Sequence, residues 1–241
     1  MHICLSDLTS SARARALGAA SAALLLLAVL PPAASAQKAL ERLQRSAKVF
    51  QQIMDAPDGG IPDIILKHAQ CVMIVPGYKK AGFGFGGELG RGIVTCRVDA
   101  GNGQAAGWSA PLFVSLGGAS FGLQIGAEES DVVMLIMNRD GENYLLKDKF
   151  SLGGDMAATA GPVGRDANVQ TDVLMHAKML AYSRSRGLFG GLTIKGGVIK
   201  PDRDSNAWMY KDATPEQILD GKVPRPPQSA SLTAELRHRA G

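Results

Sequence analysis

The sequence predicts an α+β protein that is mainly β, with a strongly curled antiparallel sheet or barrel-like core covered by N-terminal amphipathic helices. Helical periodicity follows an apolar leader and stops near residue 70, and from there to about residue 210 short apolar runs alternate with turn residues. Most of the 29 glycines lie in this second region, several of them inside the apolar runs. Because glycine weakens an ordinary strand, its frequency indicates sharp coiling, bulges or close backbone approach.

Residues 1–36 have the pattern of a cleaved signal peptide. Arg13 and Arg15 supply positive charge, an uncharged run follows over 16–30, and Ala34-Ser35-Ala36 has the small side chains that a signal peptidase requires. We expect cleavage after Ala36, which gives a periplasmic or secreted protein with peripheral membrane association. The alternative is a retained anchor, for which the apolar run is short and is ended by a proline pair.

The segment Lys38–Met54 predicts an amphipathic helix. Its apolar residues recur at intervals of three and four, and the basic residues fall largely on the rest of the helix surface. Asp58-Gly59-Gly60 ends this helix, and residues 61–69 predict a second, shorter helix with Pro62 in its first turn. These two helices are the expected cover of the sheet.

About ten strands are expected in the rest of a single domain that spans residues 37–222. They are residues 71–75, 82–87, 92–98, 108–116, 120–126, 132–137, 144–146, 155–160, 173–182, 188–195 and 198–200. The segment 173–182 also fits a helix, because short apolar runs do not separate the two periods, and we favour a strand. Thr214-Pro215-Glu216 predicts the start of a brief helix through Leu219. Residues 223–241 are expected to form a mobile polar tail.

Cys71 and Cys96 are the two cysteines that follow the leader, and both lie in apolar, strand-like sequence. In an oxidising compartment such a pair can form a disulfide. The alternative is two buried thiols that act as small hydrophobic side chains. No histidine lies near them in the sequence, so they do not predict a zinc site.

The sequence contains none of the motifs that would predict catalysis, a metal or a cofactor. The formal net charge of +4 is too small, and too evenly spread, to indicate a nucleic-acid partner. There is no G-x-S-x-G or H-E-x-x-H motif, and the glycines of residues 82–87 are followed by a strand rather than by the helix of a dinucleotide site. The candidate carboxylates are interpreted as solvated turn residues. They are Asp99, Glu128, Glu129, Asp131 and Asp140.

What remains is basic and amphipathic. The helix Lys38–Met54 can lie on an anionic surface, and the alternative is that its apolar face packs on the sheet. Two further pairs of basic residues flank apolar or aromatic residues at predicted strand ends, and the second pair precedes the apolar tip Leu188-Phe189. The candidate lipid-binding residues are Lys38, Arg42, Arg45, Lys48, Phe50, Lys79, Lys80, Arg184 and Arg186.

Several short blocks follow one another with compatible spacing. They are residues 71–76, 80–83, 86–87, 90–92, 108–111, 122–126, 161–165 and 182–191. Together these blocks resemble the SYLF-domain family, a lipid-binding module that is related to fungal actin-patch SH3 proteins and also occurs beside SH3 or FYVE domains in eukaryotes. The resemblance covers residues 39–210.

The resemblance implies binding of phosphoinositides or other acidic phospholipids, with the N-terminal amphipathic helix as the membrane element. Carried over by position, this helix is Lys38–Met54. Actin binding, which occurs in some fungal members, is not transferred to a chain expected to be exported, for which bacterial acidic lipids are the available ligands. The sequence thus favours non-enzymatic lipid binding. An envelope scaffold or stress-response module that meets a protein at Leu188-Phe189 is the second hypothesis, and an unrecognised enzyme is the third.

Overall fold

The computed structural model describes residues 33–57, 60–99, 105–146, 149–152, 158–163, 177–185, 188–194 and 196–240. The chain divides into two compact units, Met1–Ser35 and Ala36–Gly241. Most of the predicted signal peptide, up to residue 32, lies outside the described residues, and so does part of the ambiguous segment 173–182. Among the described residues, no helix combines the length and the apolar character needed to cross a bilayer.

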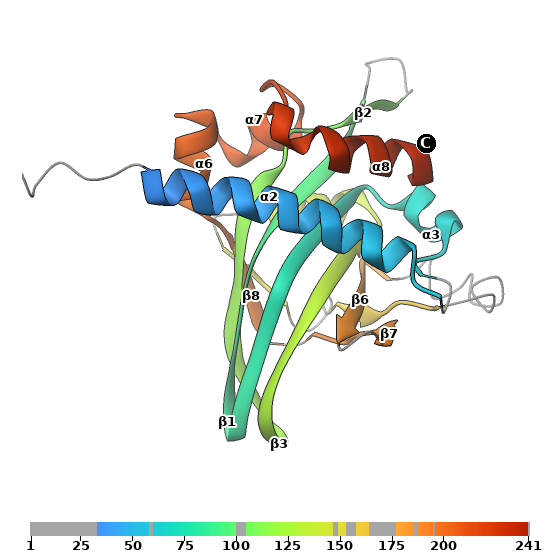
Figure 1. The fold of residues 1–241 in the computed structure, drawn as a ribbon, viewed down its shortest axis with the longest axis vertical. Helices are drawn as coiled ribbons and strands as arrows, with labels where there is room; N and C mark the ends of the chain where they lie inside the picture. The colour runs from blue at the N-terminus through green and yellow to red at the C-terminus, as the bar shows by residue number, and fades with distance from the viewer. Residues whose placement is uncertain are drawn as a thin grey trace, which may run out of the picture. The chain divides into compact units, whose positions relative to one another are not determined.

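Within the described residues, eight strands form one sheet, in which β1 (Cys71–Asp99) and β3 (Leu112–Ile136) are the longest members. These two strands pair antiparallel over nearly their whole length (Figure 1). β2 (Ala105–Trp108) pairs with the end of β1, and β6 (Met179–Ser185) pairs with β3. The shorter strands at the margins are β4 (Phe150–Ser151), β5 (Thr159–Ala160), β7 (Leu188–Gly191) and β8 (Gly197–Pro201). The sheet curls into a half-barrel, which confirms the predicted fold class.

The curl brings the second half of β1 against the first half of the same strand. A Cβ atom placed on Gly92 would lie 2.2 Å from the carbonyl oxygen of Ile74, and one placed on Gly90 would lie 2.4 Å from Cγ1 of Val75. Only residues without a side chain fit such contacts. The predicted close approach of backbones therefore occurs here, and strands that were expected to be separate join into the single bent strand β1.

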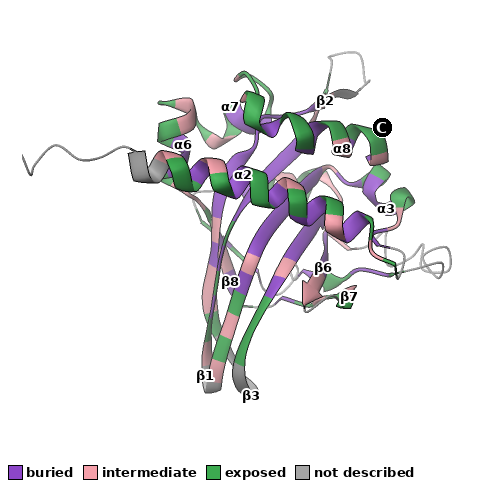
Figure 2. Ribbon diagram, viewed as in Figure 1, coloured by how far each residue is buried: buried purple, intermediate pink, exposed green. Residues whose placement is uncertain are grey.

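Where the helices cover it, the sheet is buried on both faces, whereas the far ends of β1 and β3 are partly exposed (Figure 2). Successive residues of β1 alternate between the two cores, with Cys71 and Met73 in one and Val72 and Ile74 in the other. One core is covered by α2 (Ala33–Met54), α3 (Asp63–His68) and α8 (Ala230–Ala240). The other contains residues of α4 (Arg139–Leu145) and α7 (Pro215–Leu219). This explains why residues 71–75 form an unbroken apolar run rather than an alternating one.

Side-chain caps start several of the short helices. α7 begins at Thr214 with a capping box to Gln217, which confirms the predicted short helix. The strand expected over 144–146 is wrong, because these residues close the helix α4. The side chain of Asn138 accepts a hydrogen bond from the backbone N–H of Gly141 and starts that helix. α6 (Arg203–Tyr210) begins in the same way at Asp202.

The C-terminal segment is folded over residues 223–240, in contrast to the expected mobile tail. Pro227–Ser229 forms a 3-10 turn, and α8 follows it directly. Leu232 and Leu236, one helical turn apart, are buried in the core beneath α2. Arg97 also donates a hydrogen bond to the carbonyl oxygen of Ala240, at 2.8 Å. Two leucines in an otherwise polar segment are weak evidence for a helix in the sequence. The surface on which these leucines pack forms only in the folded chain.

Candidate anion-binding site

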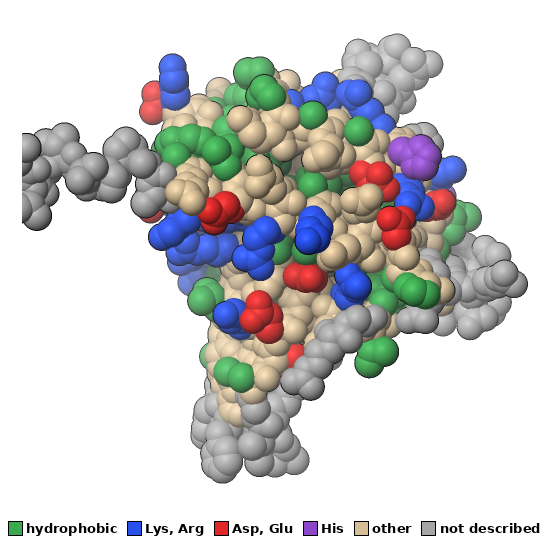
Figure 3. All heavy atoms as spheres, viewed as in Figure 1, with side chains coloured by type: hydrophobic (Ala, Val, Ile, Leu, Met, Phe, Trp, Pro, Cys, Tyr) green, Lys and Arg blue, Asp and Glu red, His purple; other side chains and the backbone are tan. Residues whose placement is uncertain are grey.

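The two faces of α2 have different surroundings. Leu43, Phe50 and Ile53 are buried, and they lie in a core cluster with residues of β1 and β3. The alternative in which the apolar face packs on the sheet is therefore the one found in the structure. Lys38 and Arg45 are exposed on the rest of the helix surface. Figure 3 shows basic side chains gathered along α2 on the face turned to the viewer.

A cavity of about 200 Å³ lies between α2 and β1. Its lining residues are Lys38, Glu41, Arg42, Arg45, Pro76 and Arg91. The four residues from α2 are three or four positions apart, so they share one face of the helix. Four of the six lining residues are basic and one is acidic, which makes the cavity suited to an anion. Glu41 already accepts a hydrogen bond from the side chain of Gln37, at 2.9 Å.

Arg42 is the buried cation of this cavity, with 7% of its side chain exposed. Its Nη2 atom lies 2.9 Å from Oδ2 of Asp202, and its guanidinium lies over the ring of Phe113, 5.3 Å from the ring centroid. Its Nη1 atom is buried and has no hydrogen-bond partner among the described residues. Burial lowers the pKa of Arg42, Asp202 opposes this shift, and the positive charge of Arg91 adds to it.

Arg91 and Pro76 complete the cavity, and neither is among the binding residues that the sequence pattern predicts. They come from the two halves of β1, which meet because Gly90 and Gly92 allow close backbone contact. Arg91 itself is exposed. The sequence pattern that could have indicated Arg91 is Gly90-Arg91-Gly92. The two glycines allow the backbone of β1 to pack closely on its own first half, and the arginine side chain between them is exposed.

The remaining candidate residues do not join this cavity. Lys48 is exposed on α2, one helical turn beyond Arg45. Lys79 pairs across the sheet with Glu129, its Nζ 3.6 Å from the carboxylate, and Lys80 lies opposite Glu128 in the same ladder. The charge of Lys79 is therefore offset by an adjacent acid, and Lys80 has an acidic residue opposite it on β3.

Phe50, Arg184 and Arg186 also lie elsewhere. Phe50 is fully buried and has no surface to offer a lipid, because the apolar period that suggested membrane contact is used by the core. Arg184 lies on β6 opposite Asp131 of β3. Arg186 lies outside the described residues.

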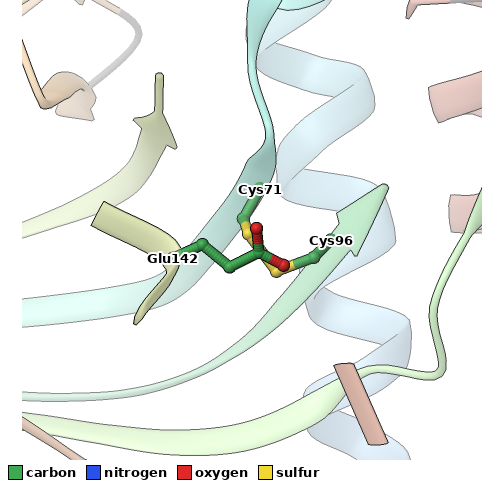
Figure 4. A group of neighbouring side chains, drawn as sticks. All are labelled: Cys71, Cys96 and Glu142. Carbon is green, nitrogen blue, oxygen red and sulfur yellow. A yellow bond between two sulfur atoms is a disulfide. The ribbon is translucent and has the colours of Figure 1, made fainter. Parts of the chain in front are cut away.

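Cys71 and Cys96 are joined by a disulfide, in agreement with the predicted pair. Both belong to β1, so the bond links the two ends of the bent strand inside a core. The carboxylate of Glu142 on α4 lies beside the two sulfur atoms (Figure 4). Burial raises the pKa of Glu142, which Arg139 opposes. Because metal binding by cysteine requires the thiolate, the bonded sulfurs do not make this group a metal site.

Two acidic residues, Asp131 and Glu88, accept hydrogen bonds from groups within the fold. Asp131 accepts a hydrogen bond from the backbone N–H of Gly77, at 2.9 Å. The buried acid Glu88 accepts one from the hydroxyl of Tyr78, at 2.6 Å, and its other oxygen packs against Gly118 and Gly197. Glu88 is thus enclosed within the sheet rather than presented to a cleft, and burial next to this carboxylate raises the pKa of Tyr78.

Residues 117–239 match the protein family described as "Ysc84: Las17-binding protein actin regulator". The chain belongs to this family. The match bears out the resemblance to SYLF-domain proteins, and the family description names binding and regulation rather than a reaction.

Curated relatives extend the match toward the N-terminus. "Protein YSC84" of Saccharomyces cerevisiae is 32% identical over 210 residues, which are 86% of this chain and 43% of that protein. "LAS seventeen-binding protein 3" of the same species is 34% identical over 187 residues, 76% of this chain and 39% of the relative. "SH3 domain-containing YSC84-like protein 1" of Homo sapiens is 30% identical over 196 residues, which are 78% of this chain and 56% of that protein. The chain therefore spans about half the length, or less, of these Ysc84-family relatives.

Proposed function

We propose that this Ysc84-family domain binds anionic phospholipid surfaces without catalysing a reaction. The observation that carries the proposal is the division of α2, whose apolar face is occupied by the core while its basic face is exposed. Contact with lipid then occurs by charge attraction to Lys38, Arg45, Lys48 and Arg91, not by insertion of the apolar face. Arg42 and Phe50 hold the helix on the sheet.

The proposed location is the periplasm or the extracellular space, after cleavage following Ala36. The charge, the apolar run and the small residues of the leader support this location. In such a compartment the ligands are the acidic lipids of the envelope.

The test is flotation of residues 36–241 with vesicles. Both buried clusters lie within this unit, so it contains its own cores. Vesicles that contain phosphatidylglycerol should recover the protein, vesicles of phosphatidylcholine alone should not, and added salt should reduce recovery because it screens exposed charges. Equal recovery by the two kinds of vesicle would contradict the proposal.

A pair of charge-reversed proteins locates the contact surface. Arg45→Glu with Lys48→Glu reverses two of the exposed basic charges of α2, and we expect the affinity for the vesicles to fall by at least about tenfold, since each basic residue near an anionic surface contributes about 1 kcal/mol. Lys67→Glu with Arg237→Glu makes the same change in net charge at exposed positions of α3 and α8. This control should retain most of the binding. Equal loss in both proteins would show that net charge, rather than α2, governs recovery.

A second candidate function is a protein-interaction module. Leu188 on β7 is 75% exposed, beside Phe189, so an apolar tip faces solvent. Names among the relatives refer to binding of a protein, Las17. A specific partner that is captured equally by the wild type and by Arg45→Glu/Lys48→Glu, and that is lost with Leu188→Asp, would favour this function.

A further inference from the structure

Two exposed arginines meet against the backbone of Gly107 on β2. A Cβ atom placed on Gly107 would lie 3.4 Å from Nη2 of Arg237 and 3.5 Å from Nη1 of Arg225. Arg225 belongs to the segment between α7 and α8, and Arg237 belongs to α8, which lies beside β2 (Figure 1). The fold therefore brings two guanidinium groups to one place, where an anion would offset the repulsion between them.

No acid that the structure describes offsets the charges of this arginine pair, Arg225 and Arg237. Neither residue forms an ion pair within the described part of the chain. The sequence contains no acidic residue over 100–110 or over 221–234. The acids that flank these two segments have basic partners of their own, namely Asp99 with Arg139, Asp220 with Lys222, and Glu235 with Arg239. The pair is thus available to an anion from outside the described residues.

A third arginine adds positive charge next to the pair. The guanidinium of Arg97 lies over the ring of Trp108, 4.8 Å from the ring centroid. Arg225 donates a hydrogen bond to the backbone carbonyl oxygen of the same tryptophan, at 2.9 Å. The acceptors that the structure shows for Arg97 are also backbone carbonyl oxygens, which carry no net charge. Hydrogen bonds thus hold these side chains in place and leave their charges uncompensated by any described residue.

Arg225 lines two cavities, and their walls differ. The first, of about 240 Å³, lies between the arginine pair and is otherwise lined by small residues and prolines within 226–234. Its two buried hydroxyl groups, those of Ser229 and Thr233, already donate to backbone carbonyl oxygens. Among the described residues, the arginines are therefore the groups of this cavity whose donors remain free.

The second cavity has a volume of about 300 Å³ and borders the first at Arg225. Its walls include Val98, Ala110 and Val223. The segment between the cavities is held extended by proline, with φ of −65° and ψ of 139° at Pro226. A segment that is ordered before binding loses little conformational entropy when a ligand binds. A cationic cavity next to an apolar one suits a ligand that has an anionic group beside an apolar group.

We infer that the surface formed by β2, α8 and the segment before α8 binds a peptide segment of a protein partner in which an acidic side chain lies next to an apolar one. The carboxylate lies between Arg225 and Arg237, whose planar groups match its two oxygen atoms. The apolar side chain enters the cavity that Val98 and Val223 line. A free phosphate would use the first cavity alone. The inference goes beyond the proposed lipid function and concerns a surface other than the apolar tip at Leu188.

The first experiment measures binding of labelled peptides by fluorescence anisotropy. The probe is a fluorescein-labelled decapeptide in which glutamate and leucine alternate, and the control peptide has glutamine in place of each glutamate. Residues 36–241 should bind the glutamate peptide at least about tenfold more tightly, because hydrogen bonds between two ionised groups are stronger than those to a neutral amide. Equal binding of the two peptides, or binding of neither, would overturn the inference.

Variants of the arginine pair locate the binding surface. Arg237→Gln removes an exposed guanidinium that forms no hydrogen bond with another described residue, so the fold should be retained. It should weaken binding of the glutamate peptide by at least about fivefold, and Arg225→Gln/Arg237→Gln should abolish the preference over the glutamine peptide. Lys200→Gln/Lys211→Gln removes two exposed cations from β8 and from the end of α6, and it should leave binding unchanged. Equal loss in the two double variants would overturn the inference, because net charge would then govern binding.

Vesicle flotation separates this inference from the proposed function. Arg225→Gln/Arg237→Gln should be recovered with phosphatidylglycerol vesicles as the wild type is, because the proposed lipid surface is that of α2. If the double variant loses vesicle recovery and the wild type does not distinguish the two peptides, the arginine pair belongs to the lipid surface and the inference is overturned. If the glutamate peptide binds in an Arg237-dependent manner and no vesicle recovers the protein, the inference stands and the proposed lipid function fails.

Discussion

The two faces of α2 show how one amphipathic helix can serve two unrelated purposes. On one face, Leu43 and Phe50 pack in a core with residues of β1 and β3. On the other, Lys38 and Arg45 border a cavity to which a strand also contributes. The first face follows the usual rule that a helix buries its apolar stripe. The second borders a cavity only because β1 bends back and places Arg91 beside the helix.

This difference bears on how amphipathic helices are interpreted. An apolar stripe with basic flanks is compatible both with a helix that lies in a membrane interface and with one that covers a sheet. In this protein the stripe is occupied, so the free energy of burying it belongs to folding. Under the proposed function, binding of lipid then depends on the exposed charges, and we expect that substitutions which leave the stability of the domain unchanged remove it.

The largest expected effect is on the buried face. Phe50→Ala should lower the free energy of unfolding by about 3–5 kcal/mol, because it removes a fully buried aromatic side chain and leaves a cavity. Arg45→Ala, on the exposed face, should change it by less than about 0.5 kcal/mol. Urea denaturation followed by circular dichroism measures both. If the two variants were equally stable, the apolar face would not be part of the core.

A smaller effect on stability is expected where the two halves of β1 pack against each other. Gly92→Ala places a methyl group against the carbonyl oxygen of Ile74 and should cost about 1–3 kcal/mol of stability, since the backbone must shift. It should also weaken vesicle binding by displacing Arg91. Gly190→Ala is the matched control, because a Cβ there meets no atom within 4 Å. An unchanged unfolding midpoint for Gly92→Ala would contradict the close contact between Gly92 and Ile74.

The smallest effect concerns pH and the ion pair that joins α2 to α6. Burial alone would raise the pKa of Asp202, but hydrogen bonds from Arg42 and from the backbone N–H of Ser205 outweigh it and hold this pKa below its ordinary value. The unfolded chain, with an aspartate pKa of about 3.9, then binds more protons than the folded chain as the pH falls. The stabilisation by Asp202 is present above that value and is lost as the pH decreases through the folded pKa.

The test is the dependence of stability on pH in urea denaturation. Asp202→Asn should be less stable than the wild type at pH 7, and below about pH 4 the difference between them should shrink. Asp212→Asn, at an exposed position, should follow the wild-type curve. A constant difference between Asp202→Asn and the wild type from pH 7 to pH 2 would show that the carboxylate charge does not contribute.

Several features follow from local patterns and were predictable. A helical period up to about residue 70, followed by strand periods, predicts a mainly β fold with helices at the start. The segment that begins at Thr214 predicts α7, because a capping box involves only neighbouring residues. A disulfide between the two cysteines that follow the leader could be proposed from their even number and the expected oxidising compartment, with two buried thiols as the alternative. The helix α4 was missed because its start depends on one side chain, that of Asn138, in a segment with aromatic and apolar residues that resemble a strand.

The sequence alone determined which residues are apolar, where glycine permits close contact, and that α2 has a basic side. The tertiary structure decided that the apolar side of α2 is covered, that the C-terminal segment packs as α8, and that Arg91 joins Lys38 and Arg45 around one cavity. Periodicity and capping arise within a few residues of the chain. A site that combines a helix with a strand whose halves fold together depends on contacts between distant residues, which form only when the sheet curls.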